Sequence, residues 1–382
     1  MPYTVLSGEQ LELRDLVRTL ARERIAPRAA EIDESHEFPW DVVALFREHG
    51  VFGLLFDEVW GGTGTGTLLA LVAIEEVSKV CATSGLIVAV QELGSLGVKL
   101  AGTAEQKERW LPRLASGEIL CAYALTEAGA GSDSAAMRTT ARLEGDEYVL
   151  DGSKRFITNA GVAGLYTVFA KTDPDAGHAG ISAFLVEADA PGFEVTRLEP
   201  KLGIAGSTTG ELAFDGCRIP VGNRLGEEGE GFRIAMQILD RSRPGVAAQA
   251  LGIAQGATDY ALEYAKTRET MGKPIAEHQL IQAKLADMYV SMNAAKAYVY
   301  AVARACDEGR TTREDAAGAI LFAAEKATWM ALEAIQCLGG NGYINDFATG
   351  RLLRDAKLYE IGAGTSEIRR MLIGREIFEK TR

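Results

Sequence analysis

The period of the hydrophobic pattern changes twice along this chain of 382 residues. Apolar residues recur at helical spacing in the first third of the chain. Alternating or β-branched segments follow, separated by turns such as Gly145-Asp146. Long helical segments with short connections then return, which is typical of an antiparallel bundle. We therefore expect a multidomain α+β protein with a helical domain at 1–118, a compact β domain at 119–228 and a helical bundle at 229–382.

Local signals place the individual elements. Capping boxes begin at Ser7 and Thr103, each with a glutamine three residues on, and Thr311 is expected to cap a later helix. We expect helices at 7–32, 40–49, 68–80, 84–100, 103–117, 232–267, 274–307, 313–338 and 366–378, and strands at 121–125, 148–157, 166–171, 181–186, 193–197 and 211–214.

Charge and cysteine content narrow the possible partners. The net charge of −13 argues against nucleic acid or an anionic membrane as the main partner, so a phosphate-bearing ligand would need local cationic spots. The five cysteines are widely spaced, without a CxxC pair or a His/Cys cluster, so neither disulfides nor a metal site is expected. A reducing compartment, the cytoplasm, is expected instead. Met1 to Ser7 show no secretory signal, and no apolar stretch approaches the roughly 18 residues of a membrane span.

The stretch from Cys121 to Asp133 combines a short strand with a loop of small residues. The loop Ala128-Gly-Ala-Gly131 would present backbone N–H groups with no side chains in the way, which suits a flat anionic ligand. Downstream, the segment Lys154 to Asn159 offers an aromatic ring beside a hydroxyl. Each piece alone is more typical of an ordinary glycine-rich turn or a buried strand.

Together with further motifs, this stretch resembles the acyl-CoA dehydrogenase family over essentially the whole chain. The resemblance implies an N-terminal helical domain, a β-barrel-like middle domain and a C-terminal four-helix bundle. It also implies FAD as cofactor, a short or branched acyl-CoA as substrate, and an electron-transfer flavoprotein as electron acceptor. The motifs are Tyr123-Ala-Leu-Thr-Glu-Ala-Gly-Ala-Gly-Ser-Asp133, Arg155-Phe-Ile-Thr-Asn159, Thr267-Arg-Glu-Thr-Met-Gly-Lys273 with Glu277-His-Gln279, Gln336-Cys-Leu-Gly-Gly-Asn-Gly-Tyr343, and Leu353-Arg-Asp-Ala-Lys357 leading to Gly364-Thr-Ser-Glu367.

The resemblance assigns two groups of residues to FAD. Thr158 should place its hydroxyl on the flavin N5, and Phe156 should stack on the ring unless it is a core aromatic. Arg268 should pair with the pyrophosphate of FAD bound to a neighbouring subunit. His278 is either a cofactor contact or a structural polar residue, and the paired glycines could also mark a buried helix end. The flavin group is Tyr123, Leu125, Thr126, Ser132, Phe156 and Thr158; the neighbour's group is Arg268 and, for the adenosine half, Gln279, Gln336, Gly339 and Gly340; Thr270, His278, Thr365 and Glu367 are also expected to contact FAD.

A site shared in this way implies at least a homodimer, and in this family commonly a tetramer. For the acyl thioester, whether carried by CoA or by a carrier protein, the resemblance points to contacts from Ser132, Thr172, Asp240, Arg243 and Gly364.

The chain departs from the family at the catalytic base. Most members carry a Glu where this sequence has Ala363, and members close to isovaleryl-CoA dehydrogenase carry it where this sequence has Ser242. Neither side chain is a competent base. Glu92 lies near the expected acyl pocket and is the candidate replacement, although it could instead pair with a cation or bind a polar substrate tail. Glu360 is expected to point into helix packing.

The missing glutamates leave two other functions open. One is an unusual reaction on the same scaffold, such as dehydrogenation away from the α-carbon, action on a carrier-bound acyl group, or a desulfinase-like elimination. The other is a non-catalytic subunit that binds flavin or thioester.

Overall fold

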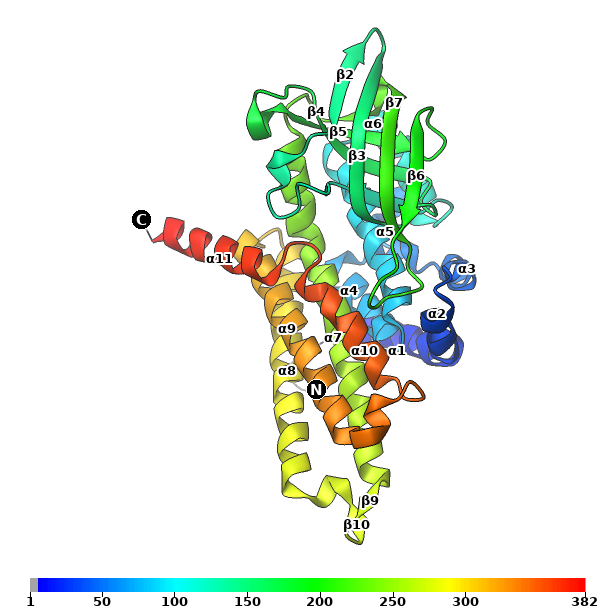
Figure 1. The fold of residues 1–382 in the computed structure, drawn as a ribbon, viewed down its shortest axis with the longest axis vertical. Helices are drawn as coiled ribbons and strands as arrows, with labels where there is room; N and C mark the ends of the chain where they lie inside the picture. Colours follow the sequence, from blue (N-terminus) through cyan, green and yellow to red (C-terminus); the bar gives the residue numbers. More distant parts are fainter. Residues whose placement is uncertain (1–5, 382) are drawn as a thin grey trace.

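The computed structural model describes residues 6–381 and contains the three expected parts in the expected order (Figure 1). A helical part is followed by a β domain and then by a bundle of long helices, which confirms the expected fold class. The expectation that Met1 to Ser7 hold no secretory signal falls mostly outside the described residues.

The N-terminal helices begin where their capping signals lie. Ser7 and Thr103 each accept a hydrogen bond from the backbone N–H three residues on, and the glutamine at that position bonds back to the cap. Two apolar helices are buried at the centre of this part. They are α4 (Gly66–Ser78) and α5 (Ala82–Ala101), and the others are α1 (Gly8–Leu20), α2 (Ala29–Ser35), α3 (Trp40–Glu48) and α6 (Ala104–Ala115).

The single helix expected over 7–32 is wrong, because the structure breaks it. Helix α1 ends at Leu20, a π-helical turn follows at Ala21–Ile25, and a 3₁₀ turn occupies Ala26–Arg28 before α2 begins. Pro27 lies in the 3₁₀ turn. Proline has no N–H and its ring crowds the carbonyl one turn earlier, so Pro27 disfavours a regular α-helix at this point.

The middle part is an eight-stranded sheet in the order β6-β7-β3-β2-β4-β5-β8, with β1 pairing in parallel with β4. Its buried face is rich in aromatic residues, including Tyr148, Tyr166 and Phe184. Strand β2 was not predicted because it is short and leaves Leu143 exposed. The strands are β1 (Cys121–Ala124), β2 (Thr140–Glu144), β3 (Glu147–Thr158), β4 (Leu165–Lys171), β5 (Ile181–Glu187), β6 (Phe193–Leu198), β7 (Thr209–Pro220) and β8 (Arg224–Leu225).

The C-terminal part is built on one long helix that runs from the β domain to the far end of the bundle (Figure 1). This helix, α7, is 37 residues long, and its buried face is dominated by Ala and Gly, which let α4, α5 and α9 approach closely. The helices are α7 (Gly231–Thr267), α8 (Gln279–Asp307), α9 (Arg313–Leu338), α10 (Thr349–Lys357) and α11 (Ser366–Lys380), and a short hairpin of β9 (Glu269–Thr270) and β10 (Lys273–Pro274) follows α7.

Two helix starts differ from expectation. Helix α8 begins at Gln279 rather than at 274, because Lys273 and Pro274 pair with β9 and a 3₁₀ turn follows. The cap of α9 is Thr312 rather than Thr311, since the Thr312 side chain accepts the N–H of Asp315.

Helix α5 is the described helix that is long and apolar enough to cross a membrane by length and composition alone. Buried residues make up 67% of its apolar window. Its hydrophobicity is therefore accounted for by packing inside the protein.

Candidate functional site

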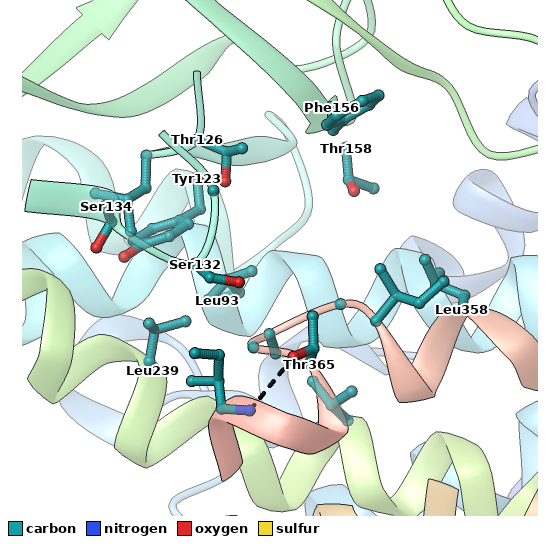
Figure 2. A pocket seen from close by; sticks show the side chains of 18 of the residues that line it. Leu93, Tyr123, Thr126, Ser132, Ser134, Phe156, Thr158, Leu239, Leu358 and Thr365 are labelled. Atoms are coloured by element: carbon teal, nitrogen blue, oxygen red, sulfur yellow. Dashed lines mark hydrogen bonds between the residues drawn. The ribbon is translucent and has the colours of Figure 1, made fainter. Parts of the chain in front are cut away.

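A cavity of about 1240 Å³ lies where the three parts of the chain meet. Figure 2 shows Thr126, Phe156 and Thr158 on its β-domain side, and Leu239 and Thr365 on its helical side. Most of the residues predicted to contact flavin or thioester line it. They are Tyr123, Leu125, Thr126, Ser132, Phe156, Thr158, Asp240, Arg243, Gly364 and Thr365.

The loop after β1 is held against β3 by a buried ion pair. Lys154 Nζ lies 2.7 Å from Glu127 Oε1 and also donates to the Leu125 carbonyl at 3.3 Å. Glu127 accepts two backbone N–H groups and the Thr139 hydroxyl. Burial opposes ionisation of Glu127, but the Lys154 charge and these hydrogen bonds hold its pKa below the ordinary value. Burial lowers the pKa of Lys154 to about 8. The pair therefore fixes the backbone that forms one wall of the cavity.

Sequence reasoning missed this pair. Glu127 stands within the glycine-rich loop, and Lys154 stands in a strand pattern at a position that turns out to be only 1% exposed. A charged residue at an inward position of a strand, with an opposite charge in an adjacent loop motif, is the signal that would have found it.

Phe156 occupies an unfavourable backbone conformation at the edge of the cavity. Its φ is 59°, in the left-handed region that bulky residues rarely adopt, and the register between β3 and β7 shifts between Lys154 and Ile157. Its ring is 57% exposed, so it is not the core aromatic of the alternative interpretation. The guanidinium of Arg155 lies 4.9 Å from the ring centroid. A strained, exposed ring lining a cavity indicates a binding surface.

Charged side chains line the cavity mostly as pairs. Arg243 donates to Asp240, whose other oxygen accepts from Arg313 at 3.1 Å. Burial raises the pKa of Asp240 and lowers that of Arg243, while their mutual attraction works against both changes. Glu127, Glu199, Asp240 and Glu376 all lie beside cations, whereas Asp133 is exposed on the loop.

Neither of the usual base positions presents a carboxylate. Ala363 lines the cavity with a φ of 55°, and Gly364 follows with a φ of 93°. Ser242 is buried, does not line the cavity, and donates its hydroxyl to the Leu239 carbonyl at 3.3 Å. Thr365 accepts the N–H of Ile368, which caps α11 and fixes the end of this segment.

Glu92 lies beside the cavity wall without lining the cavity. Its neighbours Ala89, Val90 and Leu93 line it, but Glu92 faces Gly245 on α7, where an added β-carbon would lie 2.8 Å from Oε2. The residue is half-buried, and its Oε2 is buried with no hydrogen-bond partner. Burial raises the pKa of Glu92 to about 7, opposed by the charge of Lys99.

A second cavity, of about 1030 Å³, lies beside the β9–β10 hairpin. It gathers Thr270, His278 and the residues predicted to hold the pyrophosphate and the adenosine half of a neighbour's FAD. His278 Nε2 lies 3.1 Å from the Thr270 hydroxyl within it. Figure 1 places this hairpin at the end of the bundle away from the β domain. The lining includes Arg268, Thr270, His278, Gln279, Gln336, Gly339 and Gly340.

Three further candidates stand apart from the cavities. Thr172 lines neither, and its hydroxyl lies 2.8 Å from that of Ser182. Glu367 is exposed in the first turn of α11 and also lines neither. Glu360 pairs with Lys357 at 2.7 Å and lines neither cavity.

The first cavity fits an isoalloxazine ring. Added β-carbons at Gly129 and Gly131 would meet nothing within 4 Å, so the loop leaves room for close approach. The exposed ring of Phe156 offers a stacking face, and the Thr126, Ser132 and Thr158 hydroxyls offer polar contacts.

Comparisons with known proteins agree along the whole chain. Three family models match in order: the acyl-CoA dehydrogenase N-terminal domain at 7–118, the middle domain at 122–217 and the C-terminal domain at 229–378. The chain is 47% identical to mitochondrial isovaleryl-CoA dehydrogenase of Oryza sativa subsp. japonica over 374 residues, covering 97% of this chain and 91% of that protein.

Solved structures agree equally well. Butyryl-CoA dehydrogenase from Megasphaera elsdenii superposes with a TM-score of 0.96 at 39% identity, covering 98% of this chain and 99% of that chain. A chain from work on the electron transferring flavoprotein of Acidaminococcus fermentans gives 0.96 at 41% identity, covering 98% of each chain. A glutaryl-CoA dehydrogenase from Mycobacterium smegmatis in complex with FADH2 gives 0.92 at 31% identity, covering 97% of this chain and 95% of that chain.

Proposed function

This chain belongs to the acyl-CoA dehydrogenase family, and we propose that it oxidises short or branched acyl-CoA thioesters to their enoyl forms with bound FAD. Relatives named isovaleryl- and butyryl-CoA dehydrogenase support an oxidoreductase acting on a CH–CH bond. Bound FAD supplies the acceptor for the hydride that leaves the β-carbon. The residues of this chain bind the thioester, orient it and take up the α-proton.

The observation that carries the proposal is one cavity lined by three distant segments. The loop at Ser132 and the bulge at Phe156 come from the β domain, and the turn at Gly364 comes from the C-terminal part. Phe156, Thr158 and Thr126 would hold the flavin ring, while Arg243 and Gly364 would meet the thioester. Bringing ring and thioester together in one partly buried space is what hydride transfer requires.

We propose that FAD is shared between subunits. In one chain the flavin wall and the adenosine-binding residues line different cavities, near the two ends of α7. A second copy would have to bring its Arg268 region to the first cavity. Large apolar side chains exposed on two helices would be buried in a homo-oligomer, a dimer or tetramer, and burial of apolar surface favours association. They are Leu280, Tyr289 and Val290 on α8, and Met371 and Ile377 on α11.

We propose Glu92 as the base. Its pKa of about 7 suits proton abstraction near neutral pH, and its Oε2 has no hydrogen bond to give up. Gly245, which has no side chain, gives the carboxylate its space, and Ala89, which is three residues before Glu92 and so on the same face of α5, lines the cavity. Substrate binding would draw the side chain out of its position beside Gly245.

The electron acceptor and the compartment are also proposals. A structural relative from work on an electron transferring flavoprotein supports that kind of acceptor for this chain. All five cysteines are free thiols, which supports a reducing compartment such as the cytoplasm.

One observation favours a second function. Ala363 and Ser242 leave the two usual base positions without a carboxylate, and Glu92 does not line the cavity. A reaction that needs no α-base, such as elimination of a good leaving group from the acyl chain, would suit that arrangement.

Anaerobic titration of the purified protein with isovaleryl-CoA, butyryl-CoA and other acyl thioesters tests both functions. We expect a yellow protein whose flavin absorbance bleaches with a saturated thioester and whose product is the 2-enoyl thioester. Turnover of a substituted thioester without flavin bleaching would favour the elimination. Protein that cannot be loaded with FAD would refute both.

A further inference from the structure

The first cavity is lined by a buried polar group that an all-hydrocarbon substrate would leave without a hydrogen-bond partner. Gln249, on α7, lines the cavity and is 0% exposed, yet its Oε1 and its Nε2 both lack a hydrogen-bond partner. Gln91 on α5 is a useful comparison, because it is a buried glutamine whose amide is fully hydrogen-bonded. It is also 0% exposed, but its Nε2 donates to the Leu114 and Ile119 carbonyls and its Oε1 accepts the Cys121 N–H.

A second polar group lies on the same cavity. Tyr359 is 1% exposed, lines the cavity, and has a hydroxyl without a partner. Burial raises the pKa of Tyr359 well above its ordinary value, so the hydroxyl keeps its proton and remains a donor. The amide and the hydroxyl can each donate and accept a hydrogen bond.

The surroundings of Gln249 define the complementary ligand. The residues that α5 contributes to the cavity are all apolar, and Val246 is the neighbouring apolar residue on α7. The nearest lining cation along α7 is Arg243, about 9 Å along the helix from Gln249; its Nη1 donates to Asp240, and its Nε has no partner. A carboxylate buried beside Gln249 would therefore lack a cation, whereas a neutral oxygen would find a donor and an acceptor. The apolar lining is Leu86, Ala89, Val90 and Leu93.

We propose that Gln249 binds a neutral oxygen on the acyl chain, a hydroxyl or oxo group beyond the β-carbon. The preferred substrates are then short oxygenated acyl thioesters rather than plain hydrocarbon ones. This inference rests on the proposed acyl-thioester function and narrows its substrate class.

Binding of unreactive analogues separates this inference from the reaction itself. S-(4-hydroxybutyl)-CoA and S-pentyl-CoA differ only in a terminal hydroxyl against a methyl, and neither has a carbonyl that would make the α-proton acidic. Isothermal titration of the FAD-loaded protein should show the hydroxyl analogue binding about tenfold or more tightly, because the methyl leaves the amide unpaired. Equal or weaker binding of the hydroxyl analogue would overturn the inference.

Two variants test whether Gln249 is the residue that causes the preference for the hydroxyl analogue. Gln249→Leu removes both polar atoms at similar volume, and the preference for the hydroxyl analogue should disappear. Gln255→Leu makes the same change further along α7 at a residue that does not line the cavity, and it should keep the preference. A preference that persists in Gln249→Leu would contradict the assignment. Failure of both analogues to bind the wild-type protein would overturn acyl-thioester binding as a whole, whereas binding without flavin reduction by any thioester would count only against the proposed dehydrogenation.

Discussion

Lys154 and Glu127 form an ion pair, 2.7 Å long, in which the lysine side chain is fully buried and the carboxylate nearly so. The pair joins β3 to the loop after β1, which together form the β-domain wall of the candidate active site. A buried pair of this kind is costly to form but still more costly to break on one side.

Lys154→Met should destabilise the fold by about 3–5 kcal/mol, because Glu127 would remain as a buried charge without its cation. Urea denaturation at neutral pH measures the loss. The double variant Glu127→Gln with Lys154→Met is the control and should recover much of it. If Lys154→Met were as stable as wild type, water would have to hydrate the Glu127 carboxylate in place of the lysine.

Phe156→Asn should separate folding from cofactor binding. Asparagine tolerates the left-handed backbone at φ 59°, and the lost ring is 57% exposed, so the apoprotein should be at least as stable as wild type. FAD affinity should fall by about tenfold or more because the stacking face is lost. Phe156→Trp keeps an aromatic face and should retain FAD. Unchanged FAD affinity in Phe156→Asn would rule out stacking.

Glu92→Gln should change the pH dependence of stability. Because the folded pKa is raised from 4.5 to about 7, the folded protein binds the proton more tightly, and wild-type stability falls as pH rises through that window. The variant should therefore gain up to about 3 kcal/mol over wild type at pH 8 and little at pH 4. Thermal melts at both pH values give the comparison.

The same variant tests catalysis. If Glu92 is the base, flavin reduction in wild type should rise with pH through about 7, and Glu92→Gln should slow it by about 10²–10⁴-fold with FAD retained. Wild-type rates in the variant would show that another group takes the proton.

In a Glu92→Gln background, Ala363→Glu should raise flavin reduction by a saturated thioester by about 10²-fold or more, because it places a carboxylate on the cavity wall. Ala363 already holds a β-carbon at φ 55°, so the longer side chain adds little backbone strain. Ala363→Gln is the matched control and should give no increase. Strong activity in Ala363→Glu with none in wild type would point to a native reaction other than α,β-dehydrogenation.

Arg268→Ala should weaken FAD retention, since a guanidinium would be lost from the proposed pyrophosphate site. Lys266→Ala, two residues earlier and outside both cavities, is the control for loss of one exposed positive charge. Flavin content after gel filtration and the elution volume report cofactor and assembly. Full retention in Arg268→Ala would contradict the shared-site proposal.

The sequence predicted most of this architecture because the strong signals are local. Two kinds of local signal predicted helices correctly. They are the capping boxes at Ser7 and Thr103 and the helical spacing of apolar residues in α4, α5, α7 and α9. The break at Pro27 was missed because one residue interrupts an otherwise helical pattern. Strand β2 was missed because its alternating pattern is short and weak.

The site was predicted less completely because its energetics depend on distant partners. The bond from Lys154 to Glu127 and the packing of Glu92 against Gly245 join segments that are distant in the sequence. The amide of Gln249 is unpaired because no group on the neighbouring segments reaches it. Residue type alone cannot distinguish Gln249 from the fully bonded Gln91. The distinction requires knowing which helices meet and which face opens to the cavity.

The length of helix α7 has a genetic consequence, because it determines which defective subunits can complement each other. At 37 residues it is about 55 Å long, so it keeps the first cavity and the second far apart in any one chain. If each flavin is shared, a cell making one version defective at Phe156 and another defective at Arg268 could still assemble a mixed dimer with one intact site. Two individually inactive alleles would then complement each other, whereas two alleles altered in the same cavity would not.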